Sequence, residues 1–190
     1  MKRIVLQFKV TPSFHLESDY FTFKVGFTDR PQNFVRREGK RHYTLFITKD
    51  FDYRTDRNQL MLNFIIIECM RERSKVEIPP LVRKLAAEFN LRHNRISIKD
   101  IHSRWGSCSS LGNLNFSLWL MLIPPHLVDY VVRHELSHLN EMNHSPRFWA
   151  EVDRLYGGVR GKGRAMEREM KACSRELYRR LAEVRKATTF

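Results

Sequence analysis

Residues 131–144 read Val-Val-Arg-His-Glu-Leu-Ser-His-Leu-Asn-Glu-Met-Asn-His. A helix is expected here, because Pro124-Pro125 precedes the stretch and apolar residues recur at helical spacing after it. On a helix, His134 and His138 leave the same face one turn apart, so both imidazoles can bind one metal ion. Glu135 stands beside the first of them. This H-E-x-x-H arrangement is typical of zinc hydrolases.

A third histidine, His144, lies six residues after the second. A continuous helix would carry it about 9 Å along the axis and onto another face, so it reaches the metal only if the helix ends. Asn140 and Asn143 favour the left-handed conformation that ends helices, and Ser145-Pro146 predicts a new helix start. The spacing equals that of the metzincin pattern H-E-x-x-H-x-x-G-x-x-H, but Glu141 replaces its glycine, so the turn must differ.

Three neutral imidazoles leave one tetrahedral position open, which is typical of a catalytic zinc site. The sequence therefore predicts Zn²⁺ held by His134, His138 and His144. Zinc lowers the pKa of its water to about 7, and Glu135 is expected to take a proton from that water and pass it to the leaving amine. The predicted reaction is peptide-bond hydrolysis. The alternative is that the histidines are satisfied by hydrogen bonds in the core.

Five side chains are candidates for binding the substrate or stabilising the oxyanion of such a reaction. Tyr130 lies one turn before the first histidine, on nearly the same helical face. The other four are polar residues nearby in the sequence, namely Arg104, Asn115, His102 and His126.

The first half of the chain is expected to be rich in β-structure. β-branched and aromatic residues with partial alternation predict strands at residues 4–10, 20–25 and 42–48. Residues 55–73 favour a buried helix, with Leu60, Phe64 and Ile67 on one face. Pro79-Pro80 is expected to open a second helix, which Asn90 closes.

The second half is expected to place a hairpin beside the metal site. Residues 95–101 alternate as a strand, residues 103–113 form a turn of small residues, and residues 114–118 read as a second strand. The helix begun at Ser145-Pro146 should end at Gly157-Gly158, and residues 159–164 favour a flexible connection. A last helix from about residue 165 carries one apolar stripe of Met166, Met170, Cys173, Leu177, Leu181 and Val184.

Composition limits the class of protein. A chain of 190 residues can bury a core without disulfides, and its three cysteines are an odd, scattered set that favours a reducing compartment. The basic N-terminus has an apolar run too short for a signal peptide, and no run approaches the ~20 residues of a membrane span. A soluble, cytoplasmic protein without a membrane partner is expected.

The charge is strongly basic and unevenly distributed. The formal net charge is +13, and the last 31 residues hold ten Lys or Arg against four Glu, a net charge of +6. A basic C-terminal helix suits a phosphate-rich partner such as nucleic acid. The alternative is a solvated helix face that keeps the protein in solution.

Two motifs in order resemble the YgjP-like metal-dependent hydrolases. The similar residues are Arg104-Trp105-Gly106-Ser107-Cys108-Ser109-Ser110, Gly112-Asn113-Leu114, the run from Asp129 to Leu139, Asn143-His144-Ser145 and Phe148-Trp149. The resemblance implies a zincin-like minimal metallopeptidase fold related to the SprT and WLM proteases, with the three histidines as zinc ligands and Glu135 as catalytic base. It also implies that the hairpin from Arg104 to Ser117 lies over the active-site cleft. Residues 1–75 carry no motif of this family.

These expectations combine into an α+β fold. Residues 1–75 are expected to form a β-rich N-terminal subdomain with a helix, and residues 76–190 a zincin-like domain whose active-site helix packs on a small antiparallel sheet. The expected function is a zinc metallopeptidase with a peptide or protein substrate. Two alternatives are a metal-dependent nucleoside triphosphate pyrophosphatase and a protein, or a protease, that acts at DNA. The sequence leaves the oligomeric state open.

Overall fold

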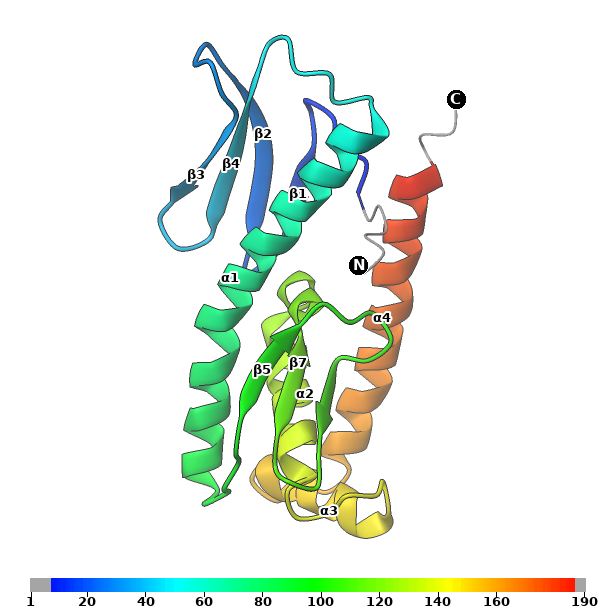
Figure 1. The fold of residues 1–190 in the computed structure, drawn as a ribbon. Coiled ribbons are helices and arrows are strands. Elements are labelled where there is room, and N and C mark those ends of the chain that lie inside the picture. The colour runs from blue at the N-terminus through cyan, green and yellow to red at the C-terminus, as the bar shows by residue number, and fades with distance from the viewer. Residues whose placement is uncertain (1–7, 187–190) are drawn as a thin grey trace.

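The chain forms an N-terminal sheet, one long helix and a helical core around a second sheet, as seen in a computed structural model that describes residues 8–186, with side chains as far as residue 183 (Figure 1). The elements are β1 (His15–Glu17), β2 (Thr22–Thr28), β3 (Phe34–Glu38), β4 (His42–Thr48), α1 (Asp56–Glu88), β5 (Ile96–Lys99), β6 (Gly106–Cys108), β7 (Leu114–Ser117), the 3₁₀ helix η1 (Leu118–Leu122), α2 (Pro125–Ser137), α3 (Pro146–Leu155) and α4 (Lys162–Lys186). The α+β class is confirmed. Within residues 8–186, none of the helices combines the length and hydrophobicity that a membrane crossing needs.

The N-terminal sheet has the strand order β1-β2-β4-β3, with β2 parallel to β4 and the other pairs antiparallel. Its two central strands confirm the strands expected at residues 20–25 and 42–48. The edge strands β1 and β3 were not expected, because they are short and largely exposed, and β3 has two consecutive arginines. The strand expected at residues 4–10 lies partly outside the described residues, and residues 8–10 form no strand.

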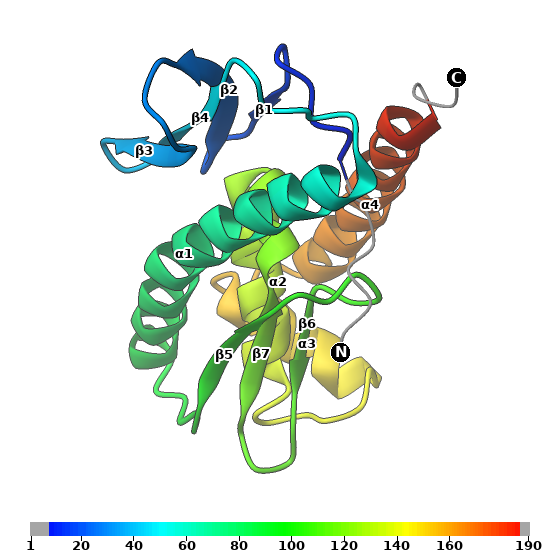
Figure 2. The same cartoon turned by 45° about the horizontal axis from the view of Figure 1, so that its top comes forward.

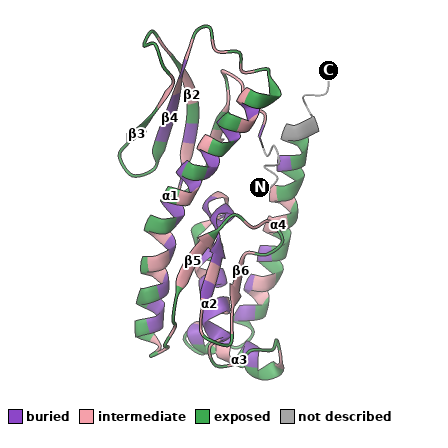
Figure 3. Cartoon of the chain, in the orientation of Figure 1, coloured by how far each residue is buried: buried purple, intermediate pink, exposed green. Residues whose placement is uncertain are grey.

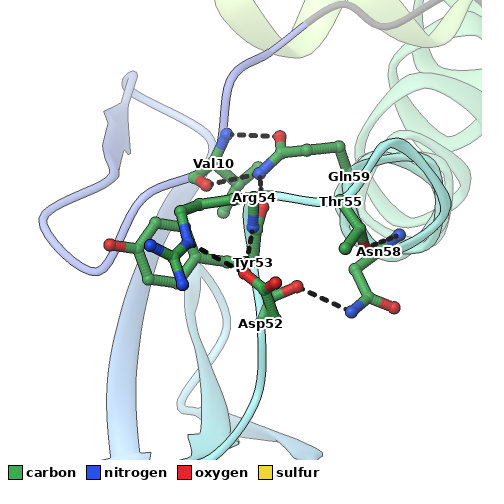
Figure 4. Close-up of polar contacts among 7 residues, drawn as sticks. All are labelled: Val10, Asp52, Tyr53, Arg54, Thr55, Asn58 and Gln59. Carbon is green, nitrogen blue, oxygen red and sulfur yellow. Dashed lines mark hydrogen bonds and ion pairs between the residues drawn. The ribbon is translucent and has the colours of Figure 1, made fainter.

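Side-chain amides of α1 replace a strand partner for residues 8–10. The Phe8 N–H donates to Asn63 Oδ1 at 2.8 Å, and Asn63 Nδ2 donates to the Phe8 carbonyl at 2.7 Å. Gln59, one turn earlier, makes the same pair of bonds with Val10, at 2.9 and 2.7 Å (Figure 4). The same region caps α1, because Thr55 Oγ1 accepts from the backbone N–H of the third helical residue. Two short polar ladders therefore fix the N-terminal segment on the helix.

The buried stripe of α1 differs from the expected one. Phe64, expected inside, is 53% exposed. The stripe instead includes Leu62, Ile66 and Met70 together with the two ladder amides, and its residues are buried. Sequence periodicity missed it because two of its positions are polar residues whose hydrogen bonds are satisfied by backbone.

The helix start expected at Pro79-Pro80 is wrong, because α1 runs without interruption through both prolines. Each proline removes one N–H from the helix, which leaves the carbonyls of Lys75 and Val76 without their usual donors. Both of these residues are exposed, so water can replace the missing bonds. Figure 2 shows that α1 curves, as proline-containing helices do. The end at Asn90 is confirmed, with a left-handed φ of 53°.

The second sheet is mixed, whereas a simple hairpin on an antiparallel sheet was expected. Its order is β5-β7-β6, with β5 parallel to β7 and β6 antiparallel to β7. The segment of small residues read as a turn contains β6, and the actual turn spans residues 109–113, where Gly112 has a φ of +71°. The chain crosses over after β5 at residues 100–105 before entering β6. The three-residue strand gave no hydrophobic alternation from which it could be predicted.

The core extends from the N-terminal sheet along α1 and η1 to α2, α3 and the second sheet, and α4 lies along the side opposite α1 (Figure 1). Figure 3 shows that α2 and β7 are largely buried. The apolar stripe of α4 is confirmed at Met166, Met170 and Leu181, which are buried, while the side chain of Val184 lies outside the described residues. The expected division of the chain near residue 75 falls inside α1 and stays a prediction.

The connection expected to be flexible at residues 159–164 is instead held tightly. Asp153 in α3 accepts hydrogen bonds from the backbone N–H groups of Gly161 at 2.6 Å and Gly163 at 2.8 Å. Gly163 packs so closely on Val152 that an added Cβ would lie 2.5 Å from its Cγ1. The carboxylate therefore caps the start of α4 and fixes its angle to α3.

Candidate metal centre

The end of α2 turns the chain so that a third histidine returns to the helix. After Ser137 the N–H groups of residues 139–141 bond back to the carbonyls of Leu136 and Ser137, and α3 then begins at its predicted cap, Ser145. The left-handed conformation expected at Asn140 and Asn143 is wrong, since Asn90 alone among the described non-glycine residues has a positive φ. Tight turn bonds end the helix earlier than residue choice indicated.

Three imidazoles meet at this turn. His134 and His138 from α2 and His144 from the following loop each offer one ring nitrogen, and these atoms all lie within 4.8 Å of one another. The Nε2 atoms of His134 and His144 are 3.0 Å apart. A tetrahedral ion with metal–nitrogen bonds of about 2.0–2.1 Å requires its ligand atoms to gather at this scale. The cluster can therefore hold a metal ion.

The opposite ring nitrogens have partners that orient the imidazoles. His134 Nδ1 lies 3.2 Å from Tyr130 Oη, and His138 Nδ1 lies 3.1 Å from the carbonyl of Glu141. Such partners leave Nε2 of each ring free for a metal and fix the ring plane. Burial, followed by the neighbouring imidazoles, lowers the pKa of His134 to about 3, and burial also lowers the pKa of His138. Both rings are therefore neutral near pH 7, the form that ligates metals.

One aromatic residue supports all three rings. The ring of Phe148 in α3 lies 4.5 Å from His138, 4.6 Å from His144 and 4.9 Å from His134, measured between centroids. The capped start of α3 places this ring, because the N–H of Phe148 donates to the Ser145 hydroxyl. The sequence indicated Phe148 only as part of the family resemblance and gave it no role at the metal site.

Glu135 lies buried beside the cluster, with 6% of its surface exposed. Burial raises the pKa of its carboxyl to about 8, and Arg104 acts in the opposite direction. Strand β6 covers it so closely that a Cβ on Gly106 would lie 2.6 Å from Glu135 Cγ and Oε1. A buried carboxyl with a pKa near neutrality can both accept and donate a proton.

A cavity of about 460 Å³ opens next to these residues. His134 and Glu135 line it from α2, and Arg104 and Trp105 line it from the segment before β6. The lining also includes Gly106, Tyr130, Val131 and the α4 residues Glu167, Met170, Lys171, Ser174 and Arg175. A smaller hollow of about 370 Å³ lies on the side of His138, against the β6–β7 turn. The imidazole cluster thus lies between the larger cavity, which His134 lines, and the smaller hollow, which His138 lines.

The family model of the YgjP-like metallopeptidase domain matches residues 23–169. The chain belongs to this family. The match confirms the resemblance read from the motifs and extends it across the whole of α1 into the N-terminal sheet, which carried no recognisable motif. No curated protein matches the sequence.

Two solved structures of archaeal zymogens are similar to part of this YgjP-like chain. The metallopeptidase zymogen abylysin of Pyrococcus abyssi has a TM-score of 0.44 and 17% identity, over 50% of this chain and 92% of its own. The metallopeptidase zymogen jannalysin of Methanocaldococcus jannaschii has a TM-score of 0.44 and 20% identity, over 50% of this chain and 95% of its own.

The candidate substrate residues of the YgjP-like site separate into two groups. Arg104 and Tyr130 line the cavity, and their role toward a substrate stays a prediction. Asn115 instead donates to Ser107 Oγ within the second sheet at 3.2 Å and does not line the cavity. His102 contacts Trp119 with the two rings tilted by 45°, and His126 pairs with Glu169 of α4 at 2.5 Å. Neither histidine lines the cavity.

Sequence reasoning missed that α4 forms a wall of the YgjP-like site. Lys171 and Arg175 are one turn apart and face the cavity, but they were read only as part of a basic surface. The signal was present in their spacing of four residues, together with Met170 on the buried stripe. Gly106 was also missed, because only the packed position of Glu135 shows why a side chain is excluded there.

Proposed function

We propose that this YgjP-like domain is a zinc metallopeptidase. The observation that carries the proposal is the placement of buried Glu135 beside three converging imidazoles, with Glu135 and His134 lining a cavity large enough for substrate side chains. His134, His138 and His144 would hold the ion, and three nitrogen ligands suit Zn²⁺ with one position left open. A bound Zn²⁺ supplies Lewis acidity, which acidifies water and polarises the carbonyl of the scissile bond.

The protein residues then move protons and hold groups in place. Glu135 accepts a proton from the attacking water and delivers it to the amine nitrogen as the C–N bond breaks, which its raised pKa permits. Tyr130 orients the ring of His134 through their hydrogen bond. Arg104 lines the cavity and is exposed, so its charge can approach a bound peptide.

The test is Glu135→Gln, which removes the proton carrier and keeps the shape of the side chain. We expect the variant to keep one Zn²⁺ per chain by elemental analysis and to lose peptide hydrolysis by at least about a hundredfold. Glu88→Gln, exposed on α1, is the matched control and should retain activity. Undiminished hydrolysis by Glu135→Gln would refute the assigned role, and absence of zinc from the wild-type protein would refute the cofactor.

The two alternative functions remain proposals with their own tests. A parallel assay with nucleoside triphosphates addresses the pyrophosphatase reading. Binding to DNA through α4 would weaken steeply with salt and would be lost on truncation after Gly163. Part of the positive charge of α4 is compensated within the helix, since Glu176 pairs with Arg179 and Arg180 at 2.8 and 2.7 Å. This pairing reduces the charge that α4 can present to phosphate.

A further inference from the structure

The cavity beside Glu135 has an apolar floor and a charged rim. Trp105, Val131 and Met170 line it with carbon surface. Val131 and Met170 are 4% and 5% exposed, so they are fixed in the core. A floor of this kind favours the methylene groups of a substrate side chain.

The rim carries more positive charge than its own carboxylates neutralise. Lys171 pairs with Glu167 at 2.9 Å, and Arg164 pairs with the same carboxylate at 3.5 Å. Arg104 and Arg175 are exposed, and their guanidinium groups form no ion pair with the residues that the structure describes. Two unpaired guanidinium groups thus face one cavity from two different segments of the chain.

The wall that carries these arginines is held in place. Trp105 Nε1 donates to Ser174 Oγ at 2.8 Å, which ties the segment before β6 to α4. The two tied residues are the immediate neighbours of Arg104 and Arg175 in the sequence. This hydrogen bond holds the two segments that carry Arg104 and Arg175 next to each other before a ligand binds. Ligand binding therefore does not need to order these segments.

We propose that this cavity selects peptide substrates with an acidic side chain, glutamate above all, next to the cleaved bond. The inference rests on the proposed peptidase function and adds the substrate class. The methylene groups of a glutamate would cover the apolar floor while its carboxylate accepts charge-assisted hydrogen bonds from Arg104 and Arg175. Lysine in the same position would meet two uncompensated cations.

Two readouts test the selection, one of cleavage and one of binding. Cleavage sites in a proteome-derived peptide mixture, read by mass spectrometry, should show Asp or Glu enriched about tenfold at one position beside the cut. Binding is measured by fluorescence anisotropy on the Glu135→Gln protein, with one labelled peptide made in Glu, Gln and Lys versions. The Glu version should bind about tenfold more tightly than the Gln version.

Charge-reversed variants locate the selectivity. Arg175→Glu and Arg104→Glu should each abolish the preference for acidic residues and improve binding of the Lys peptide, and Arg175→Gln should reduce the preference without inversion. Arg168→Glu is the matched control, because Arg168 is exposed on the same helix and does not line the cavity. An equal effect of Arg168→Glu and Arg175→Glu would overturn the inference in favour of overall charge.

The outcomes separate this inference from the proposed function. Cleavage with no acidic preference would overturn the inference and leave the peptidase standing. Selective, Arg175-dependent binding of the Glu peptide without cleavage of any peptide would support the cavity's selectivity and refute the peptidase. Hydrolysis of a nucleoside triphosphate that also displaces the Glu peptide, with no peptide cleaved, would overturn both.

Discussion

Replacing Gly106 with alanine should disable the candidate site without disturbing the metal ligands. The new Cβ would lie 2.6 Å from Glu135 Cγ and Oε1 and 2.8 Å from Cδ. Ordinary van der Waals contact begins at 3.4 Å, so the two groups must separate by about 0.8 Å, the difference between those distances. Gly106 does not have a positive φ, so alanine causes no backbone strain there and the clash is the whole perturbation.

The size of the effect follows from the confinement of Glu135. Because β6 lies directly against the Glu135 side chain, the added methyl group must displace the carboxyl from its place beside His134. A displacement approaching 1 Å costs a reaction about a hundredfold, or about 2.7 kcal/mol of transition-state stabilisation. Overpacking should also lower the free energy of unfolding by about 1–3 kcal/mol.

The assay compares kcat/KM for peptide hydrolysis, zinc content and thermal unfolding in the same preparations. We expect Gly106→Ala to lose about a hundredfold in kcat/KM while keeping its zinc. Gly26→Ala is the control, since its Cβ would meet the Phe46 ring at 3.3 Å on the N-terminal sheet, and it should leave kcat/KM unchanged. Wild-type kcat/KM in Gly106→Ala would refute the reasoning, because Glu135 would then act from a different position.

Two further predictions concern groups that hold the site in place. Tyr130→Phe removes the hydrogen-bond partner of His134 Nδ1 and should weaken zinc binding about tenfold in a competitive chelator titration. An unchanged zinc affinity would show that this hydrogen bond does not support the metal site. Asp153→Ala removes the acceptor of two N–H groups at the start of α4 and should lower the free energy of unfolding by about 1–3 kcal/mol in urea titrations, whereas an unshifted midpoint would show that solvent replaces both bonds.

The convergence of the three histidines was predictable from sequence because it depends on local rules. Spacing of four residues places two imidazoles on one helical face, and a serine followed by proline starts a new helix, so the chain between them must turn. The way in which it turns was not predictable. Backbone hydrogen bonds to the Ser137 carbonyl end the helix, and such bonds cannot be inferred from the identities of the residues.

Long-range packing decided the features that sequence reasoning missed. Two consecutive prolines normally mark a helix boundary, but α1 continues through Pro79 and Pro80. The carbonyls of Lys75 and Val76, which lose their N–H donors, belong to exposed residues that water can reach. Asn63 and Gln59 sit on the buried face of α1 because the backbone near residues 8–10 satisfies them. The tolerated prolines and the buried amides both depend on the tertiary environment of each residue. The hydrophobic periodicity of the sequence contains no information about that environment.

The uninterrupted course of α1 has a practical consequence for protein engineering. A truncation after residue 75, where the motif-free segment ends, would cut the helix in mid-course and leave a new terminus without a cap. The N–H groups of residues 76–78 would lose their acceptors there, and Pro79 has no N–H. The truncation would also remove Ser74, whose hydroxyl lies 3.3 Å from the carbonyl of Leu118 in η1. A shorter chain that begins before Thr55 keeps the natural cap of α1, but it loses the backbone of residues 8–10 that satisfies the buried amides of Gln59 and Asn63.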